Sequence, residues 1–215
     1  MRKDLIRSSV AVVAFTVLLG LVYPLVMTGI AQVAFPGKSE GSLIRSGGKV
    51  TGSTLLGQAW RKPVLDQAGR PTKDADGNPV TEPDPRYFQP RPSATGYSAS
   101  VTFFANRGPN QASTRDLTRQ HIEAYLSLER PYNRGLTAAK VPIDAATFSA
   151  SGVDPDISRT NAGIQARRIA AVRHLSPDRV ARLIAQNTDG RGLGLFGERG
   201  VNTTTLNHAL DQEAR

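Results

Sequence analysis

The chain has 215 residues, of which 39% are hydrophobic, and its 20 glycines and 14 prolines make it rich in turns. This length suits one ordinary domain with an appendage, and the absence of cysteine excludes a disulfide framework, a thiolate metal site and a cysteine nucleophile. Lysine and arginine outnumber aspartate and glutamate by 27 to 18, a formal net charge of +9 that suits a nucleic acid, anionic lipid headgroups or an acidic protein partner.

The first predicted element is an apolar segment that holds no charged residue from Ser8 to Gly37. About 30 residues reach about 45 Å as a helix, which is longer than the roughly 30 Å hydrocarbon core of a bilayer. A cleaved signal peptide is the alternative, but the apolar region of a signal peptide is only about 7–15 residues long. We therefore expect a short N-terminus at residues 1–7, a retained transmembrane anchor helix at residues 8–35, and a soluble domain at residues 36–215.

Pro24 lies inside the predicted span and cannot donate a hydrogen bond to the carbonyl of Gly20, four residues earlier. We expect a kink at Gly20–Pro24, and the small Gly20 would allow another helix to approach closely. A kinked helix without such a neighbour is the alternative. Three basic residues precede the span and three follow it within about 15 residues, so the positive-inside rule does not orient the anchor.

The soluble part begins with a predicted hairpin. Residues 42–60 have Gly47-Gly48 as a turn, with apolar positions on both sides of it. From residue 38 onward the chain carries 24 basic and 17 acidic residues, so most of the positive charge, +7, belongs to this domain.

Residues 61–86 form a polar, proline-rich insert in which the pattern D-x-x-G-x-P occurs twice, in DQAGRP (66–71) and DADGNP (74–79). Asp at the first and Gly at the fourth position are typical of type I turns, so we expect an extended surface excursion with two turns. A calcium loop in DADGN is the alternative, but an EF-hand loop requires Gly at its sixth position, where Pro79 stands.

The rest of the chain alternates helical and extended patterns. Residues 115–130 have helical spacing with an apolar side, residues 141–152 predict a strand that runs into a turn, and residues 163–187 predict two helices. These helices are separated at Ser176-Pro177, where the serine can cap and the proline can take the first helical position. A glycine-rich loop, a short extended piece and a final helical turn or two follow. The predicted fold class is α+β: a single N-terminal transmembrane helix followed by one soluble α+β domain.

The helix pair at residues 163–187 has two interpretations. Two short helices and a tight turn are compatible with a helix-turn-helix that binds DNA through Arg167, Arg168, Arg173, Arg179 and Arg182. We favour a pair of amphipathic helices with the arginines in solvent, because no third helix is predicted and the chain has an anchor. The apolar side would then consist of Ile164, Ile169, Val172, Leu175, Val180, Leu183 and Ile184.

The sequence contains no recognisable catalytic motif. An anchor followed by serines and lysines is the arrangement of leader peptidases, in which Ser42, Ser46 or Ser53 could be activated by Lys49 or Lys62. None of these serines lies in a nucleophile motif, and the three histidines lack the spacing of metal ligands. The residues alone therefore indicate an anchored, basic binding or assembly domain.

Several sequence blocks nevertheless occur in a characteristic order. They are G-x-x-Y-P (Gly20, Tyr23, Pro24), GSLI (41–44), GSTLLGQ (52–58), YFQPRPSA (87–94), GPN (108–110), VPIDAATFSASGVDPDIS (141–158), Q-x-x-R (Gln165, Arg168) and VNTTTLNHALD (201–211). With these blocks the chain strongly resembles the C-subunit (KdpC) family of Kdp-type potassium-transporting P-type ATPases, from the anchor to Asp211. It departs from the family's usual pattern in the insert and in FFANRG (103–108), where the family usually has a Gly-Gly-Ser-Asn run.

The resemblance implies a non-catalytic accessory subunit of a high-affinity, ATP-driven potassium uptake pump. Its implied partners are a channel-like subunit that selects potassium, a P-type ATPase subunit that carries the catalysis, and membrane lipid, with no nucleic acid. In the family the C subunit is held to stabilise the assembly, and it has been proposed as a chaperone that raises the affinity of the ATPase subunit for ATP. The implied location is the cell membrane, with a single pass, a cytoplasmic N-terminus and an extracytoplasmic domain. Because ATP is cytoplasmic, no nucleotide site is assigned to this chain, and ATP is expected to act through the ATPase subunit. No catalytic residue or metal ligand is assigned either.

The block YFQPRPSA predicts a rigid surface segment. Pro90 and Pro92 fix φ and favour an extended backbone, so Arg91 and Ser93 are presented on a stiff ledge that the preceding aromatic pair would hold to the domain.

Arg91 either faces a partner or pairs internally with a carboxylate such as Asp154 or Asp211. In the internal alternative, YFQPRPSA and DPDIS are turns whose polar groups satisfy one another. The residues expected to matter for partner binding or structure are Gly20, Tyr23, Pro24, Gly52, Ser53, Gln58, Tyr87, Phe88, Arg91, Pro92, Ser93, Asn110, Asp154, Ser158, Asn202, Asn207 and Asp211.

Overall fold

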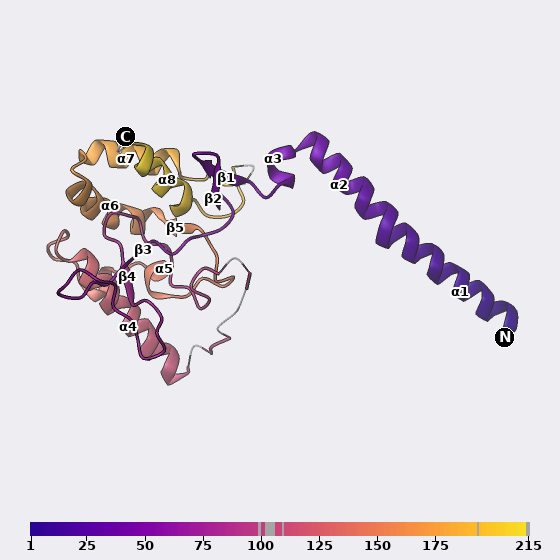
Figure 1. The fold of residues 1–215 in the computed structure, drawn as a ribbon, viewed down its shortest axis with the longest axis horizontal. Coiled ribbons are helices and arrows are strands. Elements are labelled where there is room, and N and C mark those ends of the chain that lie inside the picture. The colour runs from indigo at the N-terminus through magenta and orange to yellow at the C-terminus, as the bar shows by residue number, and fades with distance from the viewer. Residues whose placement is uncertain (99, 102–105, 109, 193, 214–215) are drawn as a thin grey trace. The chain divides into compact units, whose positions relative to one another are not determined.

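The computed structural model describes residues 1–98, 100–101, 106–108, 110–192 and 194–213 (Figure 1). The first part of FFANRG falls on residues 103–105 and lies outside the described residues. The chain divides into two compact units, Met1–Ser53 and Thr54–Arg215, and each is described by itself.

The first unit begins with a long apolar helix. It runs as α1 (Arg2–Val17), a π-helical turn (Leu18–Val22) and α2 (Tyr23–Ala34). This helix of 33 residues, none of them buried, is long and apolar enough to cross a membrane, as the sequence predicted.

The π-helical turn lies where the kink was predicted. The N–H of Tyr23 reaches the carbonyl of Leu18, five residues earlier. The next residue, Pro24, has no N–H to donate to Gly20. A wider turn just before a proline is a common way for a helix to accommodate the missing hydrogen bond.

A predicted hairpin completes the first unit. After the short helix α3 (Pro36–Ser39), strands β1 (Leu43–Ser46) and β2 (Lys49–Ser53) pair antiparallel. The turn is Gly47-Gly48, with φ values of 57° and 78°, and glycine adopts such positive φ values without strain.

The second unit contains short strands and longer helices. Its elements are β3 (Arg61–Pro63), β4 (Thr81–Pro83), α4 (Ala112–Glu129), a 3₁₀ turn (Ala138–Lys140), α5 (Ile143–Ala146), β5 (Asp156–Ser158), α6 (Arg159–Arg173), α7 (Pro177–Gln186), β6 (Gly200–Asn202) and α8 (Thr203–Glu213). In the described part of this unit the strands form two antiparallel pairs, β3–β4 and β5–β6, rather than one larger sheet. The mixture of helices and strands agrees with the predicted α+β class.

The main hydrophobic core lies where α6, α7 and α8 meet around the β5–β6 pair, and Figure 1 shows these three helices together in orange and yellow. A second cluster joins α4 to α5 and the loop before it. The first core is built from Phe88, Ile157, Ala162, Ile169, Val180, Leu183, Val201, Leu206 and Leu210, and the second from Tyr125, Leu126, Leu136 and Ala145.

The insert consists of two turns that project from the β3–β4 pair. Asp66 and Asp74 each accept two backbone N–H bonds through Oδ1, and the N–H groups of Gly69 and Gly77 close the turns onto the aspartate carbonyls at 3.0 and 3.1 Å. Val64 donates to the carbonyl of Val80 at 2.9 Å at the base. The two predicted turns are therefore present at both D-x-x-G-x-P patterns.

Two predictions of secondary structure need correction. Residues 141–152 form no strand: Ile143–Ala146 are helical, and the 3₁₀ turn lies just before them. The final helix is also longer than a turn or two, with 11 residues from Thr203 to Glu213. The two helices at 163–187 are present, but α6 begins at Arg159 because Ser158 caps it, and α7 is capped by Ser176 as predicted.

Candidate functional site

The sequence blocks that are distant along the chain meet in a buried polar network. Two side-chain amides hold the backbone of the YFQPRPSA segment. Asn207 of α8 accepts the N–H of Phe88 at 2.8 Å and donates to its carbonyl at 2.9 Å. Gln165 of α6 bonds in the same way to both backbone groups of Gln89, at 2.7 and 3.0 Å. Each amide thus takes the place of a neighbouring strand for one residue of this segment.

A buried ion pair supports the other side of the same segment. The guanidinium of Arg168 bonds to Glu129 of α4 at 2.8 Å, and both side chains are fully buried. Arg168 also donates to the carbonyls of Pro85 and Tyr87 and to Gln165. Burial raises the pKa of Glu129, and the charge and hydrogen bond of Arg168 act in the opposite direction. Arg168 was predicted to lie in solvent, and that prediction is wrong because its donors are needed for buried carbonyl groups.

A second part of the network surrounds Asp144. Its carboxylate accepts the N–H and hydroxyl of Ser158 at 2.8 and 2.9 Å, and the amide of Asn161 at 2.9 Å. The Ser158 hydroxyl accepts the N–H of Asn161 and so begins α6. Tyr125 of α4 donates to Asn161 at 2.9 Å, and burial raises the pKa of this tyrosine, which keeps its hydroxyl a donor.

Arg91 pairs internally. Its guanidinium lies 3.3 Å from the carboxylate of Asp154 and donates to the carbonyl of Phe148 at 3.2 Å. The neighbouring Ser93 donates to the carbonyl of Gly152 at 2.6 Å, and the carbonyl of Pro92 accepts the N–H of Ser149 at 2.8 Å. These contacts join YFQPRPSA to the block that ends in DPDIS.

The other carboxylate considered for Arg91, Asp211, has different partners. It binds Arg173 at 2.8 Å and accepts the hydroxyl of Tyr87 at 3.1 Å. The ring of Tyr87 lies between the guanidinium of Arg173, 4.7 Å from its centroid, and the ring of Trp60, 4.6 Å from its centroid. The aromatic residue is thereby fixed on the surface of the core, next to the fully buried Phe88.

The last block ties the network to the first residues of the second unit. Asn202 donates to the carbonyl of Thr54 at 2.8 Å, and Thr204 donates to the carbonyl of Leu56 at 2.8 Å. Asn202 also accepts the N–H of Thr205 at 3.1 Å, which caps α8.

The remaining predicted residues lie in other parts of the chain. Gly20, Tyr23 and Pro24 belong to the apolar helix, and Gly52 and Ser53 belong to β2, where Ser53 donates to the carbonyl of Gly41 at 2.7 Å. Gln58 is half-buried, and Asn110 is exposed just before α4.

Several network residues were not singled out as site residues from the sequence. They are Glu129, Asp144, Asn161, Gln165 and Arg168. Gln165 and Arg168 form the quoted Q-x-x-R block, whose spacing of three places both on one face of a helix, and Asp144 lies in the block at 141–158, whereas Glu129 and Asn161 lie in no block.

The geometry does not favour the alternative chemistries. Of the five arginines that suggested DNA binding, Arg168, Arg173 and Arg179 form ion pairs with Glu129, Asp211 and Glu213. Lys62, considered as a catalytic base, pairs with Glu82 at 3.0 Å. Among the described residues no cluster of three histidine or acidic side chains could hold a metal ion.

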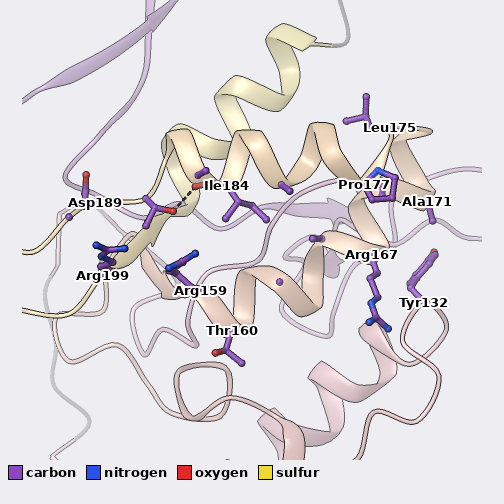
Figure 2. A pocket seen from close by; sticks show the side chains of 17 residues that line it. Tyr132, Arg159, Thr160, Arg167, Ala171, Leu175, Pro177, Ile184, Asp189 and Arg199 are labelled. Atoms are coloured by element: carbon purple, nitrogen blue, oxygen red, sulfur yellow. Dashed lines mark hydrogen bonds between the residues drawn. The ribbon is translucent and has the colours of Figure 1, made fainter.

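Two cavities accompany the network. The smaller, about 350 Å³, lies beside the Arg91 segment and is lined in part by Tyr97, His121 and Tyr125. The larger, about 1140 Å³, is lined by α6 and α7 and the loops around them (Figure 2). Its walls include Arg159, Arg167 and Arg199 and one carboxylate, Asp189.

Comparison with known proteins identifies the family. Residues 5–212 match the family model described as "KdpC: K+-transporting ATPase, c chain". This chain belongs to the KdpC family. Similar proteins named "Potassium-transporting ATPase KdpC subunit" occur in Mycobacterium tuberculosis (strain ATCC 25618 / H37Rv), with 37% identity over 99% of this chain and 100% of the relative. Another occurs in Dechloromonas aromatica, with 40% identity over 99% of this chain and 100% of the relative. A third occurs in Sorangium cellulosum, with 40% identity over 94% of this chain and 94% of the relative.

Family membership confirms the resemblance read from the sequence blocks. The chain is a KdpC subunit of a potassium-transporting ATPase, which makes it an accessory component of the pump and implies partner subunits. Its single N-terminal apolar helix fits a single-pass membrane protein.

Proposed function

We propose that this KdpC chain is a non-catalytic assembly subunit of a high-affinity potassium uptake pump. It holds together a channel-like subunit that selects potassium and a P-type subunit that hydrolyses ATP. The single observation that supports this role most strongly is the buried network. The polar side chains of the motif blocks bond to one another and to backbone groups inside the domain, so they serve to make a rigid body and do not converge on an open reaction centre.

The proposal includes a location and an orientation. The apolar helix anchors the chain in the cell membrane, with a cytoplasmic N-terminus and an extracytoplasmic domain at the entrance of the potassium-selecting subunit. The kinked region Gly20–Pro24 contacts a helix of a partner subunit, for which the open surface around Gly20 leaves room.

With the domain outside the cell and ATP in the cytoplasm, ATP contacts the ATPase subunit and not this chain. The family alternative, a chaperone that raises the ATP affinity of the ATPase subunit, requires an effect transmitted through the assembly. An independent membrane-anchored binding domain remains the alternative from a different class.

The test is purification in a mild detergent through a C-terminal tag, with all genes of the complex expressed. We expect a channel-like potassium subunit and a P-type ATPase to be recovered together, with ATP hydrolysis that depends on potassium. Recovery of this chain alone would contradict the assembly role and favour the independent binding domain. The KM for ATP, measured with and without this chain, decides the chaperone alternative: an unchanged KM excludes it.

A further inference from the structure

The larger cavity has a floor of small side chains. On α6 the lining residues follow helical spacing along one face, and those on α7 do the same. Because most of these side chains are glycine or alanine, the two helices leave an open space between them instead of filling it. The small lining residues are Gly163, Ala166, Ala170, Ala171, Ala181 and Ala185.

The rim of the cavity is positively charged. Arg159, Arg167 and Arg199 are exposed, and within the described part of the chain none of them has an ion pair or a side-chain hydrogen bond. Asp189 is the one acidic residue in the lining, so three arginines and one carboxylate leave a net charge of +2. The contrast with Arg168, Arg173 and Arg179 is informative, because those arginines of the same helix pair are neutralised within the fold.

The arginines are placed along the cavity rather than at one point. Arg159 begins α6 and Arg167 follows two turns later, about 12 Å along the helix axis. In Figure 2, Arg159 and Arg199 lie toward the Asp189 end and Arg167 lies toward the Tyr132 end. This spacing suits carboxylates two turns apart on a helix better than a single phosphate, which would require the arginines to converge on one point.

We infer that this cavity is a docking groove for an amphipathic helix of a partner subunit, with an apolar face and carboxylates about two turns apart. Small residues allow a third helix to approach α6 and α7 closely. At about 1140 Å³, the groove offers space on the scale of a few helical turns. The carboxylates pair with Arg167 at one end and with Arg159 and Arg199 at the other. This inference rests on the proposed assembly role.

The first test is site-specific photo-crosslinking in cells that express the whole complex. A photoreactive residue replaces Ala171, inside the groove, and in a matched control it replaces Gln186, which is exposed on α7 but does not line the groove. We expect the Ala171 position alone to give a crosslinked peptide from another pump subunit, with a helical apolar pattern and Asp or Glu residues. Equal crosslinking at both positions, or crosslinks to lipid alone, would overturn the inference.

The second test reverses charge. Arg167→Glu should lower recovery of the crosslinked subunit by about tenfold, whereas Arg182→Glu, the same change outside the groove, should alter it less than about twofold. Replacing the matching carboxylate of the partner by Arg should restore recovery with Arg167→Glu. Both variants should melt like the native chain, because neither arginine has an ion pair or a side-chain hydrogen bond within the described residues.

The outcomes separate the two proposals. If the native chain recovers its partners and Arg167→Glu does so equally well, the groove is not an interface and the assembly role stands. If the native chain recovers none, the assembly role itself fails. A rise in melting temperature with inorganic phosphate that Arg167→Glu abolishes, without crosslinks at Ala171, would assign the groove to a small anion instead.

Discussion

Glu129 and Arg168 form an ion pair in the interior of the domain, with 2.8 Å between Nε of Arg168 and Oε1 of Glu129. Removing charges from water is unfavourable, and the attraction between the two groups offsets that loss only when their other hydrogen bonds are also made. Arg168 satisfies this condition through two carbonyls and Gln165, whereas one oxygen of Glu129 has no hydrogen-bond partner among the residues that the structure describes. The pair therefore specifies how α4 and α6 fit together more than it stabilises the domain.

Arg168→Met is expected to lower the free energy of unfolding by about 3–5 kcal/mol, because it leaves the carboxylate of Glu129 buried without a cation. The double variant Glu129→Leu/Arg168→Met should be less destabilised than the sum of the single variants. Urea unfolding of all the variants gives the coupling in a double-mutant cycle. Additive effects would show that the two side chains do not act as a pair.

Asp156 is a carboxylate in an unfavourable environment. Burial raises its pKa, with smaller contributions from the charges of Asp154 and Asp189, and its buried Oδ1 has no hydrogen-bond partner in the described part of the chain. Because the pKa is higher in the folded state than in the unfolded state, the ionised group destabilises the domain at neutral pH, and stability is regained as the pH falls through the folded-state pKa.

Asp156→Asn should therefore raise the melting temperature at pH 7, by about 2 °C. The difference from the native chain should shrink as the pH is lowered toward the range in which Asp156 is protonated. Thermal melts monitored by circular dichroism at several pH values measure this trend. A variant that is less stable at pH 7 would mean that the carboxylate makes a favourable contact.

At the scale of elements, the two aspartate turns of the insert, residues 65–79, are independent of the core. Residues 65–79 contain no buried side chain. The two residues that flank them, Val64 and Val80, are joined by a hydrogen bond between the N–H of Val64 and the carbonyl of Val80. The turns are stabilised by their own aspartates. Strands β3 and β4, which end next to Val64 and begin next to Val80, pair antiparallel, with Pro63 opposite Thr81.

Replacing residues 65–79 by Asn-Gly should thus give a two-residue hairpin turn between Val64 and Val80. The domain should melt within about 4 °C of the native chain, because no core contact is removed. Loss of cooperative melting would show that the insert supports the fold. A domain that folds but no longer recovers its pump subunits would assign the insert to the interface.

Elements with local signals were predictable, and those fixed by distant contacts were not. Gly47-Gly48, the two aspartate turns and the Ser176-Pro177 cap depend on neighbouring residues, and all were read correctly. Residues 143–146 were predicted as extended, yet they are helical, with Asp144 holding Ser158 and Asn161. The Glu129–Arg168 pair joins residues 39 apart, and no local pattern marks a buried charge.

For the candidate site, the sequence left two partners open for Arg91. Only the folded chain distinguishes them, since Asp211 is already engaged by Arg173. Arg91→Ala is expected to lower the melting temperature of the domain by a few degrees, because it removes the contacts with Asp154 and Phe148. If the variant melted normally but failed to recover partner subunits, Arg91 would belong to the interface after all.

For the molecule as a whole, the division into two units has a direct consequence. Both hydrophobic clusters lie within residues 54–215, and the apolar helix has no buried residue. The second unit therefore does not depend on the anchor for its core.

A protein that comprises residues 50–215 should fold in water without detergent. It retains the carbonyls of Thr54 and Leu56 that Asn202 and Thr204 require. We expect a single cooperative thermal transition and a monomer in sedimentation experiments. Aggregation or a gradual transition would show that the first unit contributes to the stability of the second.

The bonds from Asn202 and Thr204 to Thr54 and Leu56 also constrain the timing of biosynthesis. They join positions 148 residues apart, so the start of the domain leaves the ribosome long before its partners have been translated. At typical rates of about 5–20 residues per second, this delay lasts about 7–30 s. The apolar helix emerges first and can enter the membrane while the domain behind it is still an open chain. If the domain is exported, as proposed above, it can cross the membrane unfolded and close afterwards through its C-terminal helix α8.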